Sequence, residues 1–259
     1  MGVAHFKKEW ISEERFRPYL ERMFHAEEAA LELYLVDRKL ASAFFRDIAF
    51  IEVALRNAIN RLLAEKFGSD WYARAEVGFD ARVRGNISEA WDSLPRRYTA
   101  QQVVRGATLG SRIVAASMFR TWTNMLDKGG GTGLAAPFER ADHDQIWDSA
   151  ALLEVFPGAR QLARAQDPNF SSQGLTREWV YHKVLPVRKI RNRVAHHEPL
   201  VLSGVPITGT NHRLSPRESF NAYMDLAAML DRDLASFLEG LRTSDELKQA
   251  ELLLDAVPD

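Results

Sequence analysis

The sequence predicts an all-α protein, because apolar residues recur at helical spacing along most of it. Hydrophobic residues make up 46% of the 259 residues and include six Trp and fourteen Phe, which is enough for a large buried core. Length and composition together favour one globular domain over residues 1–259. Within it we expect an inserted helical section over residues 70–169 and a motif-bearing helix over about residues 176–198.

The first helical pattern covers residues 18–67, which contain no Gly, and no Pro after Pro18. A stretch of fifty residues is longer than a typical globular helix. The pattern therefore predicts two helices that meet near Val36–Ser42, and Gly68 ends the second of them.

The other expected helices are bounded by capping and turn-forming residues. They cover residues 86–95, 111–126, 141–156, 176–197, 216–240 and 244–254. Thr176 is a candidate N-cap, and Pro186 predicts a kink or a restart in the same helix. Ser215–Glu218 matches a capping box. The glycines of residues 129–133 indicate a flexible connection, and residues 200–216 a loop or at most a short hairpin.

Composition and motifs exclude several classes of function. The absence of Cys excludes disulfides, thiol catalysis and thiolate metal sites. The sequence has no HExxH helix, no phosphate-binding glycine motif and no G-x-S-x-G turn, so we expect neither a metal nor a cofactor. It also lacks a signal-peptide pattern and any apolar run of about 18 residues, so we expect a cytoplasmic protein without a membrane partner.

Charge is segregated along the chain, although the formal net charge is −1. Residues 179–217 contain seven Lys or Arg, one acid and four of the seven His. Residues 225–259 contain nine acids and three bases. A locally basic surface on a nearly neutral chain suggests a defined anion site. The alternative is that the two segments pair with each other across a helix interface.

Arg191, Asn192 and His196 form the strongest candidate site. Their helix has to end within Val194–Pro199, so His196 lies in its last turn, where the backbone carbonyls favour a cation. Asn192 and His196 share a helix face that Arg191 borders. A histidine at such a position can exchange protons near neutral pH, which suits phosphodiester cleavage. The alternative is a solvated basic helix end, and His197 is expected to be a surface or supporting group.

A second polar group interrupts the apolar pattern of residues 18–67. Glu52 and Arg56 are spaced i and i+4, so they can pair along a helix, and Asn57 follows them. In such apolar surroundings the pair is either a structural brace or the support of a site, with Glu52 orienting Arg191 or His196. We therefore expect the helix with Glu52 to pack against the motif helix.

The motif Arg191–His197, R-N-R-V-A-H-H, occurs together with several other recognisable segments. These are Leu33-Tyr34, Leu40–Phe44, Ile51–Asn57, Ser117–Trp122, Ile146-Trp147 and Phe156-Pro157. The set resembles the Abi-like family of bacterial abortive-infection proteins, whose members resemble HEPN-type ribonucleases and carry an R-x4-6-H motif, commonly R-N-x-x-x-H-H. The resemblance implies a HEPN-like helical bundle with an inserted helical middle section.

The resemblance also implies a metal-independent endoribonuclease of phage defence, of the abortive-infection or toxin type. A base would take the proton of a ribose 2′-OH, which would attack the adjacent phosphorus and leave a 2′,3′-cyclic phosphate. His196 would be the acid–base group, Arg191 would hold the phosphoryl oxygens, and Asn192 would position the phosphate or the histidine. Four bases would add affinity for RNA: Lys183, Arg188, Lys189 and Arg193.

One histidine does not easily serve as both acid and base, so the resemblance implies a homodimer that brings two motifs together. RNA is the expected partner, and an antitoxin or a small RNA is a candidate regulator. Two alternatives belong to other classes of protein. One is a non-catalytic RNA- or protein-binding helical module of a defence or toxin–antitoxin system. The other is a helical scaffold whose basic segment pairs with its own acidic C-terminal part.

Overall fold

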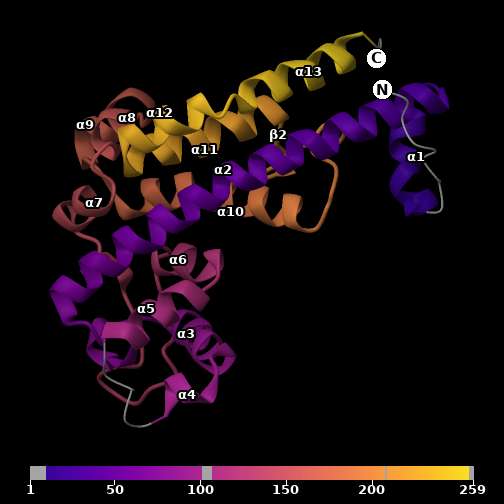
Figure 1. Ribbon diagram of the computed structural model, residues 1–259. Coiled ribbons are helices and arrows are strands. Elements are labelled where there is room, and N and C mark those ends of the chain that lie inside the picture. Colours follow the sequence, from indigo (N-terminus) through magenta and orange to yellow (C-terminus); the bar gives the residue numbers. More distant parts are fainter. Residues whose placement is uncertain (1–9, 101–106, 208, 257–259) are drawn as a thin grey trace. The chain divides into compact units, whose positions relative to one another are not determined.

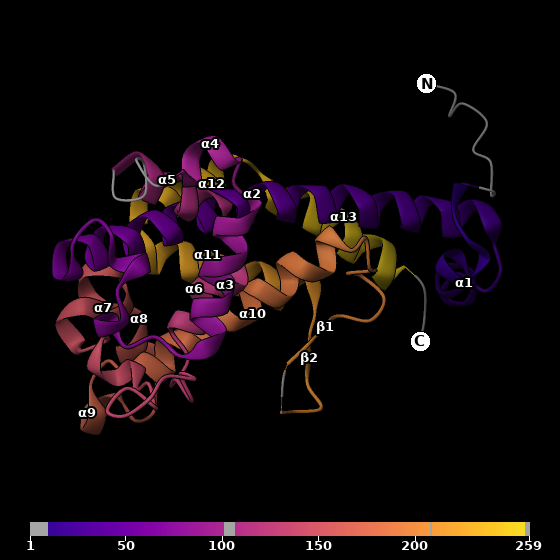
Figure 2. The same cartoon turned by 90° about the horizontal axis from the view of Figure 1, so that it is seen from below.

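Helices dominate the residues that the computed structural model describes, 10–100, 107–207 and 209–256, which confirms the predicted all-α class. The α-helices of these residues (Figure 1) are α1 (Glu13–Arg22), α2 (Glu27–Phe67), α3 (Ala81–Ser93), α4 (Arg96–Thr99), α5 (Ala107–Ala116), α6 (Phe119–Met125), α7 (Ser149–Val155), α8 (Ala159–Gln166), α9 (Phe170–Gln173), α10 (Arg177–Ala195), α11 (Pro216–Leu230), α12 (Arg232–Gly240) and α13 (Thr243–Asp255). Short 3-10 helices are η2 (Trp71–Ala73), η3 (Ala75–Val77) and η4 (His143–Gln145). Strands β1 (Val205–Pro206) and β2 (Arg213–Leu214) pair antiparallel in the connection between α10 and α11 (Figure 2).

The chain divides into two compact units. Unit 1 contains Met1–Asp47, Lys189–Asn221 and Phe237–Asp259, and unit 2 contains Ile48–Arg188 and Ala222–Ser236. Helices α2, α10, α11 and α12 therefore contribute residues to both units. The single domain with an inserted section over residues 70–169 stays a prediction.

Unit 1 is held together by aromatic and aliphatic side chains of α2. Tyr34 packs edge-on against Tyr19 and Phe16 of α1, with ring centroids 5.2 and 6.3 Å apart. The ring centroids of Phe44 and of Phe220 in α11 are 6.4 Å apart. These contacts fix α1 and the start of α11 on the part of α2 that also faces the end of α10.

Unit 2 has a core rich in large aromatic residues. Helix α3 packs against α5 and α6. Trp71, Trp122 and Phe156 are almost completely buried. The indole of Trp147 donates a hydrogen bond to the carbonyl of Met125 at 2.7 Å, so a buried donor is satisfied by the end of α6.

The helix break predicted at Val36–Ser42 is wrong, because α2 is continuous from Glu27 to Phe67. The chain turns earlier, before α2, where Phe24 and His25 have φ angles of 49° and 63°. Asp37 lies within the predicted break and is completely buried, with hydrogen bonds to both carboxylate oxygens. A polar residue whose hydrogen bonds are satisfied can therefore occupy the core side of an unbroken helix.

Two boundaries in the middle of the chain also differ from those expected. Helix α3 begins before Asn86, because Asp80 caps it by accepting a hydrogen bond from the backbone N–H of Val83 at 3.0 Å. The helix expected over residues 111–126 is two helices, α5 and α6, because Met118 has an extended backbone between them.

Two further helix boundaries differ because of local caps, and one predicted interruption of a helix is not present. Asp148 caps α7, so only part of the helix expected over residues 141–156 is α-helical. The side chain of Asp231 accepts from the N–H of Asp233 at 2.7 Å and separates α11 from α12, where one long helix was expected. Pro186 causes no restart, since α10 runs through it without a break.

Several sequence signals are confirmed. Thr176 accepts a hydrogen bond from the N–H of Trp179 at 3.2 Å, as an N-cap does. Ser215 and Glu218 form the predicted capping box, with reciprocal bonds of 2.7 and 3.2 Å. Residues 200–216 form the predicted loop with a short hairpin. No α-helix in the described ranges has the length and apolar character needed to span a bilayer.

Candidate active site at the end of helix α10

The C-terminal end of α10 borders a pocket of unit 1 with a volume of about 300 Å³. The residues around it come from α2, from α10 and from the turn that follows α10. They are Arg38, Ala41, Ser42, Phe45, Val194, Ala195 and His197. The wall is mostly apolar, with Arg38 and His197 as its ionisable groups. Such a pocket can hold a small part of a larger ligand while a few polar groups orient it.

Helix α10 ends in a turn with a left-handed residue. His197 has a φ of 56°, which an L-residue other than glycine adopts at a cost in free energy. Its N–H donates to the carbonyl of Val194, and the N–H of Glu198 donates to the carbonyl of Arg193, both at 3.0 Å. This is the Schellman pattern, which satisfies carbonyls at the helix end. The helix therefore ends within the predicted interval, and the turn brings His197 to the pocket.

The motif side chains have different environments. Asn192, His196 and His197 are exposed, whereas Arg191 is half-buried. The N–H of His196 donates to the carbonyl of Asn192 at 2.9 Å, so both residues belong to the same last turn. The guanidinium carbon of Arg191 lies 6.0 Å from the centroid of the Phe45 ring, which is a pocket wall. Within unit 1, α10 thus lies beside α2, and His197 lines the pocket, whereas His196 is exposed on the same helix end.

Asp37 holds the segment that follows the motif. Its Oδ1 accepts hydrogen bonds from the backbone N–H groups of Leu200 and Val201 at 3.0 and 3.1 Å. Its Oδ2 accepts from the Tyr19 hydroxyl and from Arg38, each at 2.5 Å. Burial, and then the neighbouring carboxylate, raise the pKa of Tyr19 far above its usual value, so this hydroxyl stays a donor. A single buried carboxylate therefore links α1, α2 and the chain after α10.

Arg38 of α2 contacts the turn that follows α10 directly. Its Nη2 donates to the carbonyl of Glu198 at 3.0 Å, and its guanidinium lies 5.8 Å from the centroid of the Tyr34 ring. The Nε of Arg38 is buried without a hydrogen-bond partner among the described residues. Arg38 thus presents a fixed positive charge to the pocket and fastens the turn that carries His197.

Arg193 holds the loop after α10 rather than facing solvent. It is 9% exposed. Its Nε donates to the carbonyl of Pro199 at 2.6 Å, its Nη1 pairs with Glu198 at 3.0 Å, and its Nη2 donates to Ser203. Burial lowers the pKa of this guanidinium. The RNA contact expected of Arg193 stays a prediction.

The other predicted RNA-binding residues are divided between the units. In unit 2, Lys183 lies 3.3 Å from Asp225, and the half-buried Arg188 donates to Asn124 at 3.3 Å. Burial lowers the pKa of Arg188. In unit 1, the ammonium of Lys189 donates to a carbonyl of β1 at 3.2 Å. The pair of Lys183 with Asp225 is the kind of contact that the charge-pairing alternative predicts.

The supporting group predicted around Glu52 belongs to unit 2. Glu52 and Arg56 are half-buried, and Asn57 is exposed. Arg56 donates through Nη1 to the carbonyl of Ala115 at 3.4 Å, so it connects α2 with α5. The pairing of Glu52 with Arg56, and its role in orienting the motif, stay predictions. Among the residues with described positions, no three acidic or histidine side chains are arranged to bind a metal ion.

Asp37, Arg38 and Phe45 are residues of this site that the sequence did not indicate. All three lie on α2, and Asp37 and Arg38 interrupt the apolar pattern within Val36–Ser42, where a helix break was predicted from the length of the pattern. The same interruption could have been taken as a sign of a buried polar network, as it was for Glu52. Two of the partners of Asp37, the backbone N–H groups of Leu200 and Val201, are 163 and 164 positions away in the sequence, so no local pattern identifies them.

Comparison with known proteins gives one similarity. Residues 4–106 match the family model described as Abi-like protein. The match covers the N-terminal part of the chain and contains Asp37, Arg38 and Phe45, whereas the motif at residues 191–197 lies outside it. Neither curated proteins nor solved structures give a match.

Proposed function

We propose that the end of α10 is the active site of a metal-independent endoribonuclease, with His196 as the acid–base group and Arg191 as the phosphate ligand. The observation that carries the proposal is the combination of an exposed double histidine and a half-buried arginine beside a pocket of about 300 Å³. This arrangement offers imidazole side chains, which can accept or donate a proton, together with a fixed cation, and transesterification of RNA requires both kinds of group.

In this reaction a histidine takes the proton from a ribose 2′-OH as O2′ attacks the adjacent phosphorus. The bond from phosphorus to the 5′-oxygen breaks, and that oxygen receives a proton from a second acid. The products are a 2′,3′-cyclic phosphate and a 5′-hydroxyl. Arg191 neutralises the charge that develops on the phosphoryl oxygens, and Asn192 shares the helix face with His196 and orients the phosphate.

The pocket and its surroundings give further residues a place in this mechanism. Arg38 and His197 line the pocket and would contact the nucleotide next to the scissile phosphate. Asp37 acts as a positioning residue, because it binds the backbone that follows the histidines. The strained backbone of His197 is consistent with a functional position, where such strain often occurs.

The biological role that fits this activity is abortive infection. The similarity of residues 4–106 to the Abi-like family supports a role in bacterial phage defence. An RNase of this kind needs restraint, so a cognate antitoxin or a small RNA is the expected regulator. The HEPN-type relationship is part of the same proposal and rests on the motif at residues 191–197.

The test is cleavage of total RNA by the purified protein in the presence of EDTA, with mapping of the product ends. We expect 2′,3′-cyclic phosphate ends. His196→Ala should lower the rate about 10²–10⁴-fold, and Arg191→Ala about 10²–10³-fold, because they remove proton transfer and charge stabilisation. His197→Ala should have a smaller effect than His196→Ala.

His182→Ala is the matched control, since His182 is an exposed histidine of α10 and lies nearly four turns before His196. Its cleavage rate should equal that of the wild type. Products with 3′-hydroxyl ends, or full activity of the His196→Ala protein, would remove the mechanism.

A scaffold function is the second candidate, because one observation favours it. Arg217 pairs with Glu251, and Lys183 lies 3.3 Å from Asp225, so bases of the segment 179–217 bind acids of the segment 225–259. If the basic segment serves only this purpose, the purified protein will neither bind nor cleave RNA, and both pairs will matter only for stability.

A further inference from the structure

We propose that a second pocket, in unit 2, binds one nucleotide of a single-stranded RNA by stacking its base on aromatic side chains. The pocket has a volume of about 340 Å³ and lies between α3 and the two 3-10 helices that precede it. The described residues that line it are Tyr72, Ala73, Arg74, Ala75, Phe79, Arg84, Ile87, Ser88 and Trp91. Three of these are aromatic, two are arginines and none is acidic.

The aromatic wall is rigid before any ligand binds. Trp71 lies behind the pocket and meets Tyr72 and Phe79 edge-to-face, with centroid distances of 5.9 and 6.1 Å. Its indole N–H donates to the Asn60 side chain of α2 at 3.0 Å. Because these rings are already fixed, a base that enters the pocket does not have to order them.

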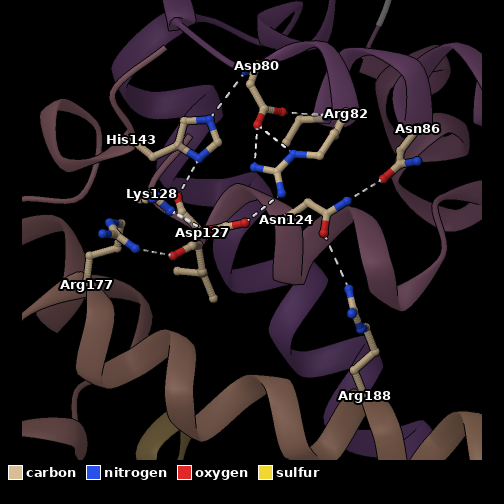
Figure 3. Close-up of polar contacts among 11 residues, drawn as sticks. Asp80, Arg82, Asn86, Asn124, Asp127, Lys128, His143, Arg177 and Arg188 are labelled. Atoms are coloured by element: carbon tan, nitrogen blue, oxygen red, sulfur yellow. Dashed lines mark hydrogen bonds and ion pairs between the residues drawn. The ribbon is translucent and has the colours of Figure 1, made fainter. Parts of the chain in front are cut away.

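A polar network around His143, Asp80, Arg82 and Asp127 (Figure 3) lies beside Phe79. The His143 ring meets Phe79 edge-to-face at 5.7 Å. Its Nδ1 lies 2.7 Å from the carbonyl of Asp127, and its Nε2 accepts from the N–H of Asp80 at 3.4 Å. Arg82 joins the two carboxylates, with contacts of 2.5 Å to Asp80 and 2.7 Å to Asp127. The network therefore fixes the backbone at the residue that follows Phe79.

The open side of the pocket suits a nucleotide rather than an apolar peptide. Trp91 is half-buried, so part of its indole is accessible, and the exposed Ser88 offers a hydroxyl to the edge of a base. Arg84 is exposed and has no ion pair with any residue in the described ranges. Arg74 is paired with Asp70 at 2.7 Å, which leaves Arg84 as the cation available to a phosphate. Aromatic stacking with a nearby cation is the usual way to bind single strands without strict sequence preference.

The identity of the RNA rests on the proposed function, but binding to this pocket can be measured without cleavage. The probe is a short, labelled single-stranded RNA with 2′-O-methyl groups, which lack the nucleophile needed for transesterification. Its affinity for the full chain is measured by fluorescence anisotropy over a range of salt concentrations.

We expect Trp91→Leu to weaken binding of the probe roughly tenfold through loss of stacking. Arg84→Gln should reduce the slope of log K against log salt by about 0.7, the contribution of one phosphate contact on a single strand. Ser88→Trp changes an exposed residue and should block the pocket, so it reports on binding even if Trp91→Leu impairs folding. Trp10→Leu and Arg160→Gln are matched controls at exposed positions outside the pocket and should leave affinity and slope unchanged.

Wild-type affinity of both folded Trp91→Leu and Ser88→Trp proteins would overturn the inference. So would binding of an aromatic peptide at this pocket without binding of the probe. If the probe binds in the expected manner but natural RNA is not cleaved, the ribonuclease proposal fails and the pocket assignment stands. If RNA is cleaved but the pocket variants bind the probe normally, the pocket assignment fails and the ribonuclease proposal stands.

Discussion

Two buried polar side chains, Asp37 in unit 1 and His143 in unit 2, fix nearby backbone through hydrogen bonds to main-chain groups. Both side chains are completely buried. If one of their hydrogen bonds were lost, the polar group left behind would have no water molecule to bind instead. In unit 1 this fixes the segment after the candidate catalytic turn. In unit 2 it fixes the wall of the aromatic pocket. Each candidate site therefore depends on a buried residue that does not line its pocket.

His143 should make the stability of the protein depend on pH. Burial lowers the pKa of its imidazole below 6.5, and this outweighs the opposite effects of nearby Asp80 and Asp127. At pH values between the lowered pKa of the folded protein and the unfolded value of 6.5, the unfolded chain binds more protons than the folded one. The free energy of unfolding that His143 contributes is therefore fully present above pH 6.5 and decreases as the pH falls through this range. Urea unfolding of the wild type at about pH 7.5 and about pH 5.5 should show the loss, in the direction that linkage requires.

His143→Gln is the comparison, because glutamine keeps hydrogen-bonding capacity but does not titrate. We expect it to be less stable than the wild type near neutral pH, with a smaller loss of stability on acidification. An equal pH dependence of the two proteins would show that other groups cause it.

At the scale of a helix end, the left-handed His197 offers a test of strain at the candidate site. Glycine adopts this backbone conformation freely, so His197→Gly should raise the free energy of unfolding by about 1 kcal/mol. His197→Val should lower it, because a β-branched residue fits this conformation poorly. Urea unfolding measures both effects, and cleavage assays show whether the stabilised variant loses activity. A destabilised His197→Gly protein would mean that contacts of the imidazole outweigh the backbone strain.

Helix ends with a local chemical signal could be predicted, and those without one could not. Thr176 and the capping box at Ser215 lie where the sequence placed them, because each signal acts within three residues. The turn at Phe24 and His25 carries neither Gly nor Pro, so its position depends on tertiary packing. The same applies to Asp37, whose burial requires partners from another part of the chain.

The part of the candidate site that is contiguous in the sequence could be predicted, and the part formed by distant residues could not. The motif around Arg191 and His196 is contiguous, so its spacing on one helix follows from the sequence alone. The pocket is formed by two helices distant in sequence, and its α2 residues, Arg38 and Phe45, could only be found once α10 was seen beside them. The left-handed turn that brings His197 to the pocket also has no clear signature in a sequence without glycine at that position.

For the whole chain, the near balance of charge limits how RNA can be attracted. With a formal net charge of −1, the protein has no general attraction for a polyanion, so binding has to come from local groups. Several bases of the segment 179–217 are already engaged, as the pairs of Lys183 with Asp225 and Arg217 with Glu251 show. In the proposed function, contacts to RNA therefore come mainly from the two candidate pockets.

The proposed homodimer rests on the number of proton-transfer groups that the proposed cleavage requires. One group accepts the proton of the 2′-OH and another donates a proton to the 5′-oxygen, whereas each chain supplies one His196 on the face of Asn192. Two protomers that meet about a two-fold axis at their α10 ends would supply both groups. Two apolar side chains of α2 in unit 1, Leu35 and Phe45, are 39% and 45% exposed, and Phe45 lines the pocket at the end of α10, so it offers apolar surface for such a contact.

Mixing two inactive proteins tests this assembly. When His196→Ala and Arg191→Ala proteins are mixed, we expect a mixed dimer to recover part of the activity, because it holds one intact histidine and one intact arginine from different chains. Full activity, which needs a second intact His196, should not return. Size-exclusion chromatography with light scattering should show a dimer at micromolar concentration, and RNA should tighten it, since the facing arginines repel each other without an anion. Full cleavage activity by a protein that stays monomeric with RNA bound would contradict the dimer. Both proton transfers would then have to occur within one chain. In that case His197, which lines the pocket, is the available second histidine.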